Sequence, residues 1–367
     1  KCFACGWIYH YISVEDGDMG IARSRQSIKK VMEQYIKTNK YKYLKKERKM
    51  ENKAVVFALT SSVGVANEIV AQLGIPLGLC EVKHFADGEI MVELGESVRG
   101  KNVYIVQSTC NPVSSNLMEV LIAIDACKRA SAAHITVVMP YFGYARQDRK
   151  AKPRQPITSK LVATLLETAG ANHVMTMELH ATQIQGFFNV PADDISAICI
   201  IGKYVQSLNL EDIVVVSPDH GGTTRARKLA EMLHAPIAII DKRRPKPNVA
   251  EAMNLIGDVE GKTAVIVDDI VDTAGTLTAG INMLRDKGAK AVYASCVHGV
   301  LSGPAIDRLK AANLDGFICT NTIEQNDKLP LYDKMHVLSV GPVLGNVIKA
   351  MEENKPVSEV VAEYAGN

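Results

Sequence analysis

Apolar residues after position 53 alternate between two patterns. Short runs rich in β-branched residues, such as 54–59, 103–107 and 135–140, are typical of strands buried in a parallel sheet. Between them lie longer segments with apolar positions at helical spacing, such as 65–73 and 116–130. This alternation predicts an α/β protein with mainly parallel sheets flanked by helices, in which loops at the carboxyl ends of the strands carry the function.

The same alternation continues in the second half of the chain. Further strands are expected at 174–177, 213–217, 237–240, 291–296, 297–304, 317–322 and 335–340, and a closing helix at 343–353. A hairpin is expected at 81–94. The basic stretch at 241–247 contains two prolines, which predicts irregular backbone there.

The most informative stretch starts as the apolar strand Val265–Val267 and closes with two carboxylates, Asp268 and Asp269. A loop of small residues follows (Asp272, Thr273, Ala274, Gly275, Thr276), and then an amphipathic helix with Leu277, Ile281 and Leu284 on one face. Free N–H groups at a helix start form an anion site. Carboxylates repel phosphate, so the acid pair suits ribose hydroxyls or magnesium-bound groups. This pattern suggests a sugar phosphate held at both ends; a plain strand-end turn with an N-capping Asp is the alternative.

The chain contains an internal sequence repeat. Residues 100–109 parallel residues 261–270, and each segment is followed by a helix and a strand. This predicts a duplicated domain. The acid pair is replaced by Gln107 and Ser108 in the first copy, which lacks the small-residue loop, so we expect one sugar-phosphate site per chain.

These patterns predict three parts. Residues 1–49 form a basic extension that we expect to be disordered or non-native, with Met50 as the natural start. Residues 54–196 form the first domain and 197–342 the second, and the C-terminal segment 343–367 is a candidate to pack on the first.

Composition narrows the class of protein. A net charge of +2 gives no argument for nucleic acid binding, and no stretch approaches the length of a membrane span. The 8 cysteines are scattered, and most lie in apolar runs typical of core thiols in a reducing cytosol. We therefore expect a cytoplasmic protein with neither a nucleic-acid nor a membrane partner.

Four further groups of polar residues are candidates for chemistry. Arg146 and Gln147 follow the strand at 135–140 and suit phosphate and base edges, although a solvated loop explains them equally well in isolation. Phe85, Asp87 and Glu89 alternate along a strand-like stretch, where the ring could stack on a purine; an exposed hairpin tip is the simpler reading of these alone.

His180 and Asp219 each follow an apolar strand and together could hold Mg²⁺. The basic residues Lys242, Arg243 and Arg244 could close over a polyphosphate and neutralise charge during transfer, or could form a basic surface loop.

Together these residues closely resemble class I ribose-phosphate diphosphokinase (phosphoribosyl pyrophosphate synthetase). The resemblance covers about residues 54–358 and is carried by the segments 85–89, 144–148, 178–180, 217–222, 241–245 and 267–276. It implies two duplicated phosphoribosyltransferase-like domains. It also implies that ATP and ribose 5-phosphate give 5-phosphoribosyl 1-diphosphate (PRPP) and AMP, for nucleotide, histidine and tryptophan biosynthesis.

The resemblance also implies a role for each matching residue. Asp272 to Thr276 would bind the 5-phosphate, and Asp268 and Asp269 the ribose hydroxyls. ATP would be bound by Phe85, Asp87, Glu89, Arg146, Gln147 and His180, the first three from a neighbouring subunit. His180 and Asp219 would hold magnesium, with two ions expected, and Lys242 and Arg244 would stabilise the transition state.

The family's regulation is the least direct of these implications. A hexamer, activation by phosphate and inhibition by ADP would be expected, with a regulatory anion site at Ser97, Arg99, Ser131, Arg154, Gln185 and Asp193. The sequence departs from the family at Glu178, where Asp is usual, at Ala86, where Ser is usual, and in the C-terminal tail.

Two other functions compete with this one. A phosphoribosyltransferase that consumes PRPP would need the acid-pair loop but not the basic segment or the ATP-facing first half. A non-catalytic, synthetase-associated regulator would be expected to lose the His180 site or the basic segment, and both are present.

Overall fold

A computed structural model describes residues 53–243 and 252–365 of the chain. The expectations for residues 1–49 and for Arg244 lie outside the described residues, and the side chain of Lys242 is not described either. Residues from Lys53 onward form one compact unit.

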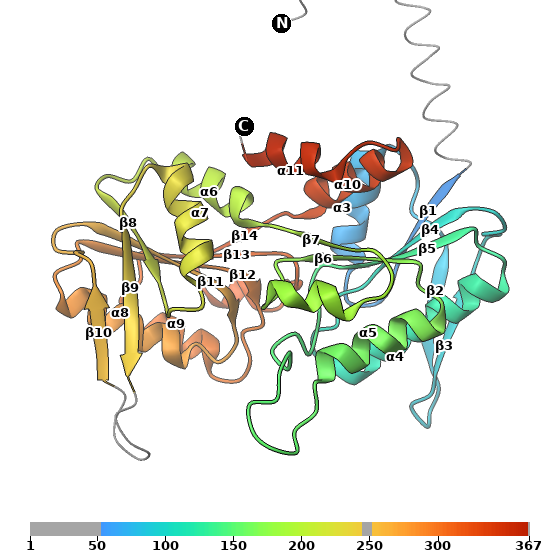
Figure 1. The fold of residues 1–367 in the computed structure, drawn as a ribbon, viewed down its shortest axis with the longest axis horizontal. Coiled ribbons are helices and arrows are strands. Elements are labelled where there is room, and N and C mark those ends of the chain that lie inside the picture. The colour runs from blue at the N-terminus through green and yellow to red at the C-terminus, as the bar shows by residue number, and fades with distance from the viewer. Residues whose placement is uncertain (1–52, 244–251, 366–367) are drawn as a thin grey trace, which may run out of the picture. The chain divides into compact units, whose positions relative to one another are not determined.

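The first half of this unit is built on a five-stranded parallel sheet. Its order is β1-β4-β5-β6-β7, with strands β1 (Ala54–Ala58), β4 (Asn102–Val106), β5 (His134–Met139), β6 (His173–Met177) and β7 (Ala192–Ile195). Its helices are α3 (Val63–Leu73), α4 (Val113–Arg129), α5 (Thr158–Ala169) and the 3₁₀ turn η1 (Thr182–Phe187). The antiparallel hairpin of β2 (Cys80–His84) and β3 (Ile90–Leu94) extends from this half (Figure 1).

The second half is built on a seven-stranded sheet. Its order is β10-β9-β8-β11-β12-β13-β14, with strands β8 (Ile213–Ser217), β9 (Ile237–Arg243), β10 (Ala252–Ile256), β11 (Thr263–Val271), β12 (Ala291–Gly299), β13 (Gly316–Thr320) and β14 (Met335–Leu338). Its helices are α6 (Ile198–Ser207), α7 (Thr223–Leu233), α8 (Gly275–Asp286), α9 (Ala305–Ala311) and the 3₁₀ turn η2 (Leu329–Leu331). Helices α10 (Gly341–Glu352) and α11 (Val357–Ala365) follow.

The two sheets confirm the duplication. The order β1-β4-β5-β6-β7 is repeated as β8-β11-β12-β13-β14, all parallel. The turns that enter β4 and β11 are alike: Gly100 and Gly261 both have φ +70°, a conformation that favours glycine. Lys101 N–H donates to Val98 O at 3.0 Å and Lys262 N–H to Val259 O at 3.1 Å.

Three local predictions were wrong. Strand β9 continues through Arg243 instead of ending at residue 240, because residues 239–243 pair antiparallel with β10, which the sequence did not suggest. One continuous strand, β12, replaces the two expected at 291–296 and 297–304. The short strand β7, with two aspartates in four residues, was not expected.

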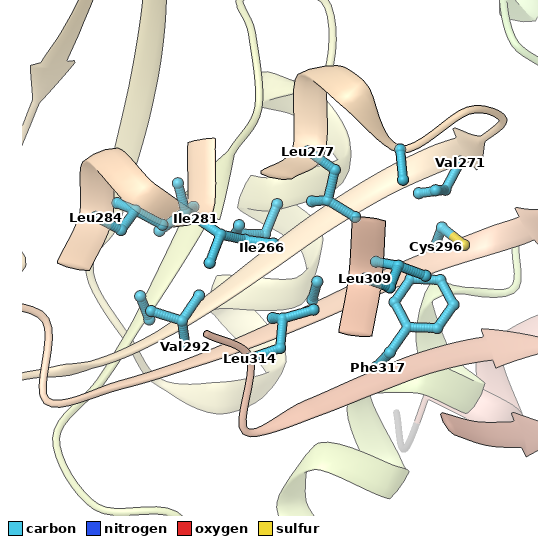
Figure 2. Packing of buried hydrophobic residues seen from close by; sticks show 14 of the residues in the cluster. Ile266, Val271, Leu277, Ile281, Leu284, Val292, Cys296, Leu309, Leu314 and Phe317 are labelled. Atoms are coloured by element: carbon cyan, nitrogen blue, oxygen red, sulfur yellow. The ribbon is translucent and has the colours of Figure 1, made fainter. Parts of the chain in front are cut away.

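The second half has a core that seats the loop after β11. Leu277, Ile281 and Leu284 of α8 are 6%, 0% and 0% exposed, as their helical spacing predicts. Figure 2 shows them facing Ile266 of β11 and Val292 of β12. The start of α8 is therefore held against the end of β11.

The closing helix α10 packs on the first half. Figure 1 shows it beside α3. A Cβ at Gly345 would lie 2.8 Å from Gln72 Cβ, so the two helices are in close contact. Asn102 Nδ2 and Tyr104 Oη of the five-stranded sheet each donate to Glu352 Oε1 at 2.8 Å.

Two further findings concern the class of protein. No helix in the described ranges is long and apolar enough to cross a membrane. The six cysteines in these ranges are all free thiols, and five of them are buried, as the apolar runs predicted.

Candidate active site

The acid pair lies near the end of a central strand of the second sheet but, contrary to the prediction, does not close it, because β11 continues to Val271 and pairs with β12 there. Asp268 and Asp269 lie near the carboxyl end of β11, which pairs with β8 on one side and β12 on the other. Asp269 is 6% exposed and its N–H donates to Asp268 Oδ1 at 2.9 Å. Strand ends in open α/β sheets are the usual place for a ligand site.

The loop after the acid pair opens helix α8. Ala274 caps this helix with φ +59°, and α8 begins at Gly275, as predicted. Thr273 and Thr276 are exposed, so their hydroxyls are accessible beside the free N–H groups of the helix start. Hydroxyls, amides and the helix dipole together suit a phosphate.

His180 from the first half reaches the acid pair. Its Nδ1 lies 2.6 Å from Asp269 Oδ2. Arg225, near the start of α7, lies between two carboxylates: its Nε is 3.0 Å from Glu178 Oε1 and its Nη1 is 3.6 Å from Asp269 Oδ1. Glu178 also accepts a hydrogen bond from Ser196 Oγ at 2.9 Å.

These contacts set the protonation of the pair. Burial and the charge of Asp269 raise the pKa of Asp268 to about 8. Burial also acts to raise the pKa of Asp269, but the hydrogen bond from His180 and the charge of Arg225 outweigh it and hold that pKa below its usual value. The same hydrogen bond, which His180 donates to Asp269, raises the pKa of His180. The pair therefore carries one negative charge near neutral pH.

A second contact joins the two halves. Arg146 Nη1 donates to Asp272 Oδ2 at 2.9 Å. Gln147 is exposed beside Arg146, and its Oε1 accepts from Thr158 Oγ1 at 2.6 Å. The structure therefore brings Arg146 and His180 to the acid-pair loop.

Asp219 lies at the end of β8, the strand beside β11. It is exposed, and its Oδ1 accepts a hydrogen bond from Gly222 N–H at 2.9 Å. Within residues 53–243 and 252–365, Asp219 makes no hydrogen bond or ion pair with His180, and no cluster of three potential metal-binding side chains occurs there.

Other predicted residues lie apart from this group. Phe85, Asp87 and Glu89 occupy the tip of the β2–β3 hairpin, and all three are exposed, Phe85 by 52%. The backbone of Lys242 lies in β9, opposite Met253.

Two of the six predicted regulatory residues touch each other. Arg99 Nη1 donates to Ser131 Oγ at 3.1 Å. Asp193 instead contacts His173 Nε2 at 3.0 Å, and Gln185 lies in η1. Ser97 and Arg154 are exposed.

Sequence reasoning missed Arg225 and the structural role of Glu178. Arg225 follows the Gly221-Gly222 turn by three residues, so it belongs to the first turn of a helix that starts at a strand end. That position was the available signal, but a charged residue in an amphipathic helix usually faces solvent.

In the first half, the position that corresponds to the acid pair is occupied by buried, hydrogen-bonded side chains. Gln107 is fully buried; its Oε1 accepts from Ser61 N–H at 3.0 Å, and its Nε2 donates to Glu119 Oε2 at 2.8 Å. Glu119 is itself 1% exposed and accepts from Thr60 Oγ1 at 2.7 Å. These bonds close the position that Asp268 occupies in the second copy.

A doubled parallel sheet with an acid pair at the end of a central strand and an anion-binding loop behind it defines an enzyme of the phosphoribosyltransferase type. Two family models match the chain: the N-terminal domain of ribose phosphate pyrophosphokinase at residues 54–170, and the phosphoribosyl synthetase-associated domain at residues 244–361.

Full-length relatives agree with these models. The chain is 57% identical over 303 residues to the ribose-phosphate pyrophosphokinase of Bacillus caldolyticus, covering 83% of this chain and 96% of that protein. It is 56% identical over 310 residues to that of Listeria ivanovii, covering 84% and 97%. The crystal structure of phosphoribosylpyrophosphate synthetase from Mycobacterium smegmatis matches with a TM-score of 0.78 and 40% identity, covering 82% of this chain and 99% of that one. The chain belongs to the ribose-phosphate pyrophosphokinase family.

Proposed function

We propose that this enzyme transfers the diphosphoryl group of ATP, as one unit, to ribose 5-phosphate. The anomeric hydroxyl attacks the β-phosphorus, the bond from the β-phosphorus to the oxygen on the α-phosphorus breaks, and AMP leaves. The hydroxyl proton passes to solvent. The product, PRPP, serves nucleotide, histidine and tryptophan biosynthesis.

The observation that carries this proposal is the pair of contacts between the two halves. His180 meets Asp269 at 2.6 Å and Arg146 meets Asp272 at 2.9 Å. One partner in each pair suits a polyphosphate, and the other belongs to the acid pair or to the sugar-phosphate loop. A donor and an acceptor bound by these groups would lie side by side, as direct transfer requires.

The acceptor would be held by the second half. The loop from Asp272 to Thr276 binds the 5-phosphate through backbone N–H groups and the two hydroxyls. Asp268 and Asp269 accept hydrogen bonds from the ribose hydroxyls. Because Arg225 and His180 fix Asp269 from two sides, its orientation is set before the sugar arrives.

The donor would be held by the first half, with Arg146 and Gln147 on the ATP phosphates. Magnesium fits His180 and Asp219. Because His180 donates its Nδ1–H to Asp269, its Nε2 is left to act as a metal ligand. A carboxylate such as that of Asp269 is the usual second partner of a metal-bound histidine. Magnesium commonly takes one or two protein ligands and completes its shell with phosphate oxygens and water. Two ions, entering with the nucleotide, would neutralise its phosphate charge.

The remaining groups would act at the edges of the site. Lys242 and Arg244 stabilise negative charge that develops during transfer. The exposed hairpin tip with Phe85, Asp87 and Glu89 presents a ring and two carboxylates to the adenine of a neighbouring subunit, which supports a homo-oligomer, a hexamer in this proposal.

Regulation belongs to the same proposal. Phosphate would activate and ADP would inhibit at the site of Ser97, Arg99, Ser131, Arg154, Gln185 and Asp193. The contact between Arg99 and Ser131 supports an anion site at that pair. The free thiols support a cytoplasmic location.

A phosphoribosyltransferase remains the second candidate in chemical terms, because it shares the acid pair and loop. It has no use for Arg146 and His180 at the loop, and these contacts favour the synthetase. A non-catalytic regulator would retain the fold but not the turnover.

The test is AMP formation from ATP, measured with and without ribose 5-phosphate and Mg²⁺. We expect AMP only when both are present, and absence of AMP under every condition, including added phosphate, would leave the regulator. Asp272→Ala should raise KM for ribose 5-phosphate more than KM for ATP; a defect confined to ATP would contradict the assignment of the loop.

A further inference from the structure

Arg308 of α9 contacts the loop that opens α8. Its Nη1 donates to the carbonyl oxygen of Thr273 at 2.8 Å. A Cβ at Gly275 would lie 3.2 Å from the same nitrogen, so the guanidinium lies directly against the first residue of the helix. Arg308 forms no ion pair with any carboxylate of residues 53–243 or 252–365.

Helix α9 is fixed in place by its own burial. Ala305 and Leu309, on either side of Arg308 in the sequence, are both 0% exposed in the core of the second half. Figure 2 shows Leu309 beside Phe317. Arg308 is therefore an exposed side chain on a rigid support, which limits its freedom at the loop.

The carbonyls of the loop are held one after another. Asp272 O accepts from Ser302 N–H at 2.9 Å, Thr273 O accepts from Arg308, and Ala274 O accepts from Thr278 N–H at 2.9 Å. In a trans peptide the C=O and the next N–H point in opposite directions. Holding Thr273 O therefore turns the N–H of Ala274 away from Arg308.

The loop needs such a support. Ala274 has φ +59°, which costs an L-residue about 1 kcal/mol or more and persists only where neighbouring contacts enforce it. The bond from Arg308 fixes the peptide that precedes Ala274. Within the described part of the chain, the N–H groups of Thr273 and Ala274 donate to no protein acceptor, so they are available to an anion.

We propose that Arg308 is a positioning residue for the 5-phosphate of the acceptor, which it serves by orienting the Ala274 N–H and by placing a positive charge behind the loop. This inference rests on the proposed function, because it assumes that the loop binds a sugar phosphate. It means that α9 helps the enzyme to select a phosphorylated sugar as acceptor. It also predicts that loss of Arg308 weakens binding of the acceptor and not of the donor.

The experiment compares Arg308→Met, which removes the hydrogen bond and the charge, with Arg308→Lys, which keeps a charge and a donor. Arg285→Met is a control for the loss of an arginine that binds backbone carbonyls: Arg285 donates to those of Asn313 and Lys290, at the other end of α8, and also pairs with Asp315. All proteins are assayed as full chains for AMP formation, and circular dichroism verifies their folding.

We expect Arg308→Met to raise KM for ribose 5-phosphate by about tenfold or more, with kcat changed by less than about threefold and KM for ATP by less than about twofold. Arg308→Lys should recover a large part of this loss, and Arg285→Met should match the wild type.

An Arg308→Met enzyme with wild-type KM for ribose 5-phosphate would overturn the inference, as would equal losses for both substrates or no recovery in Arg308→Lys. A wild-type protein that forms no AMP would instead show that the proposed function has failed, so the two failures are distinguishable.

Discussion

The two adjacent aspartates at the end of β11 should respond in opposite ways to the same isosteric change. Asp269 contacts His180 at 2.6 Å and lies 3.6 Å from Arg225 Nη1, while no cation within the described ranges forms an ion pair with Asp268. We therefore compare Asp269→Asn with Asp268→Asn in the ligand-free protein.

The structure sets the size of each effect. Asp269→Asn leaves the guanidinium of Arg225, whose side chain is 12% exposed, with Glu178 as its remaining partner. Removing one member of a buried ion pair costs about 3–5 kcal/mol, and because Glu178 remains we expect about 2–4 kcal/mol. Asp268→Asn should instead stabilise the protein near pH 6, by about 3 kcal/mol, because the folded wild type must hold a proton on Asp268 that the unfolded chain releases, whereas Asn needs none.

The pH dependence has a definite sign. The pKa of Asp268 rises from 3.8 to about 8 on folding, because of burial and the charge of Asp269. Between these values the folded protein holds a proton that the unfolded chain releases. Wild-type stability therefore falls as pH rises, by up to about 1.4 kcal/mol per pH unit for this group, and Asp268→Asn removes that fall.

The assay is urea denaturation followed by circular dichroism at several pH values between about 5 and 8, at one protein concentration because the enzyme is expected to be oligomeric. Asp258→Asn, at an exposed aspartate paired with Lys262, is a control that should leave the pH slope unchanged. Equal losses in the two test variants, or an Asp268→Asn slope equal to that of the wild type, would refute this reasoning.

Three other changes test separate parts of the structure. Lys242→Ala should lower kcat by about 100-fold with a much smaller change in KM for ribose 5-phosphate; an unchanged kcat removes Lys242 from catalysis. Gly345→Ala should cost about 1–3 kcal/mol, read as a lower Tm, because the new Cβ would lie 2.8 Å from Gln72 Cβ; an unchanged Tm would mean that α3 and α10 separate freely. Asp194→Asn should stabilise the protein above pH 6, because burial raises the pKa of Asp194 to about 6 and the wild type loses stability as pH rises from 3.8 to that value. Thermal unfolding at neutral pH measures this last change, and a less stable variant contradicts it.

Much of the fold was predictable because burial in a parallel sheet leaves a strong local pattern. The strand 213–217 was predicted with its observed ends, and the start of α8 with its loop followed from small residues between an apolar strand and an amphipathic helix. The end of β9 was not predictable from residues 241–247 alone, because a strand continues wherever a partner pairs with it, and that partner begins at Ala252.

The candidate site was predictable only in its separate parts. The loop and the acid pair are contiguous in sequence, so their roles could be proposed together. The contact between His180 and Asp269 spans 89 residues, and it depends on how the two halves pack. Arg225 and Arg308 were missed because only tertiary structure shows that these helical arginines contact residues of the site.

The contact between α3 and α10 has a consequence for the synthesis of the chain. Helix α3 is made early, but its Glu68 accepts a hydrogen bond from Ser339, 271 residues later. Asn102 of the first sheet donates one to Glu352, 250 residues later. At about 5–20 residues per second a ribosome needs about 12–50 s to make that interval. Throughout it, the face of α3 that α10 covers stays open to water, so we expect nascent chains to depend on a chaperone until the last helix emerges.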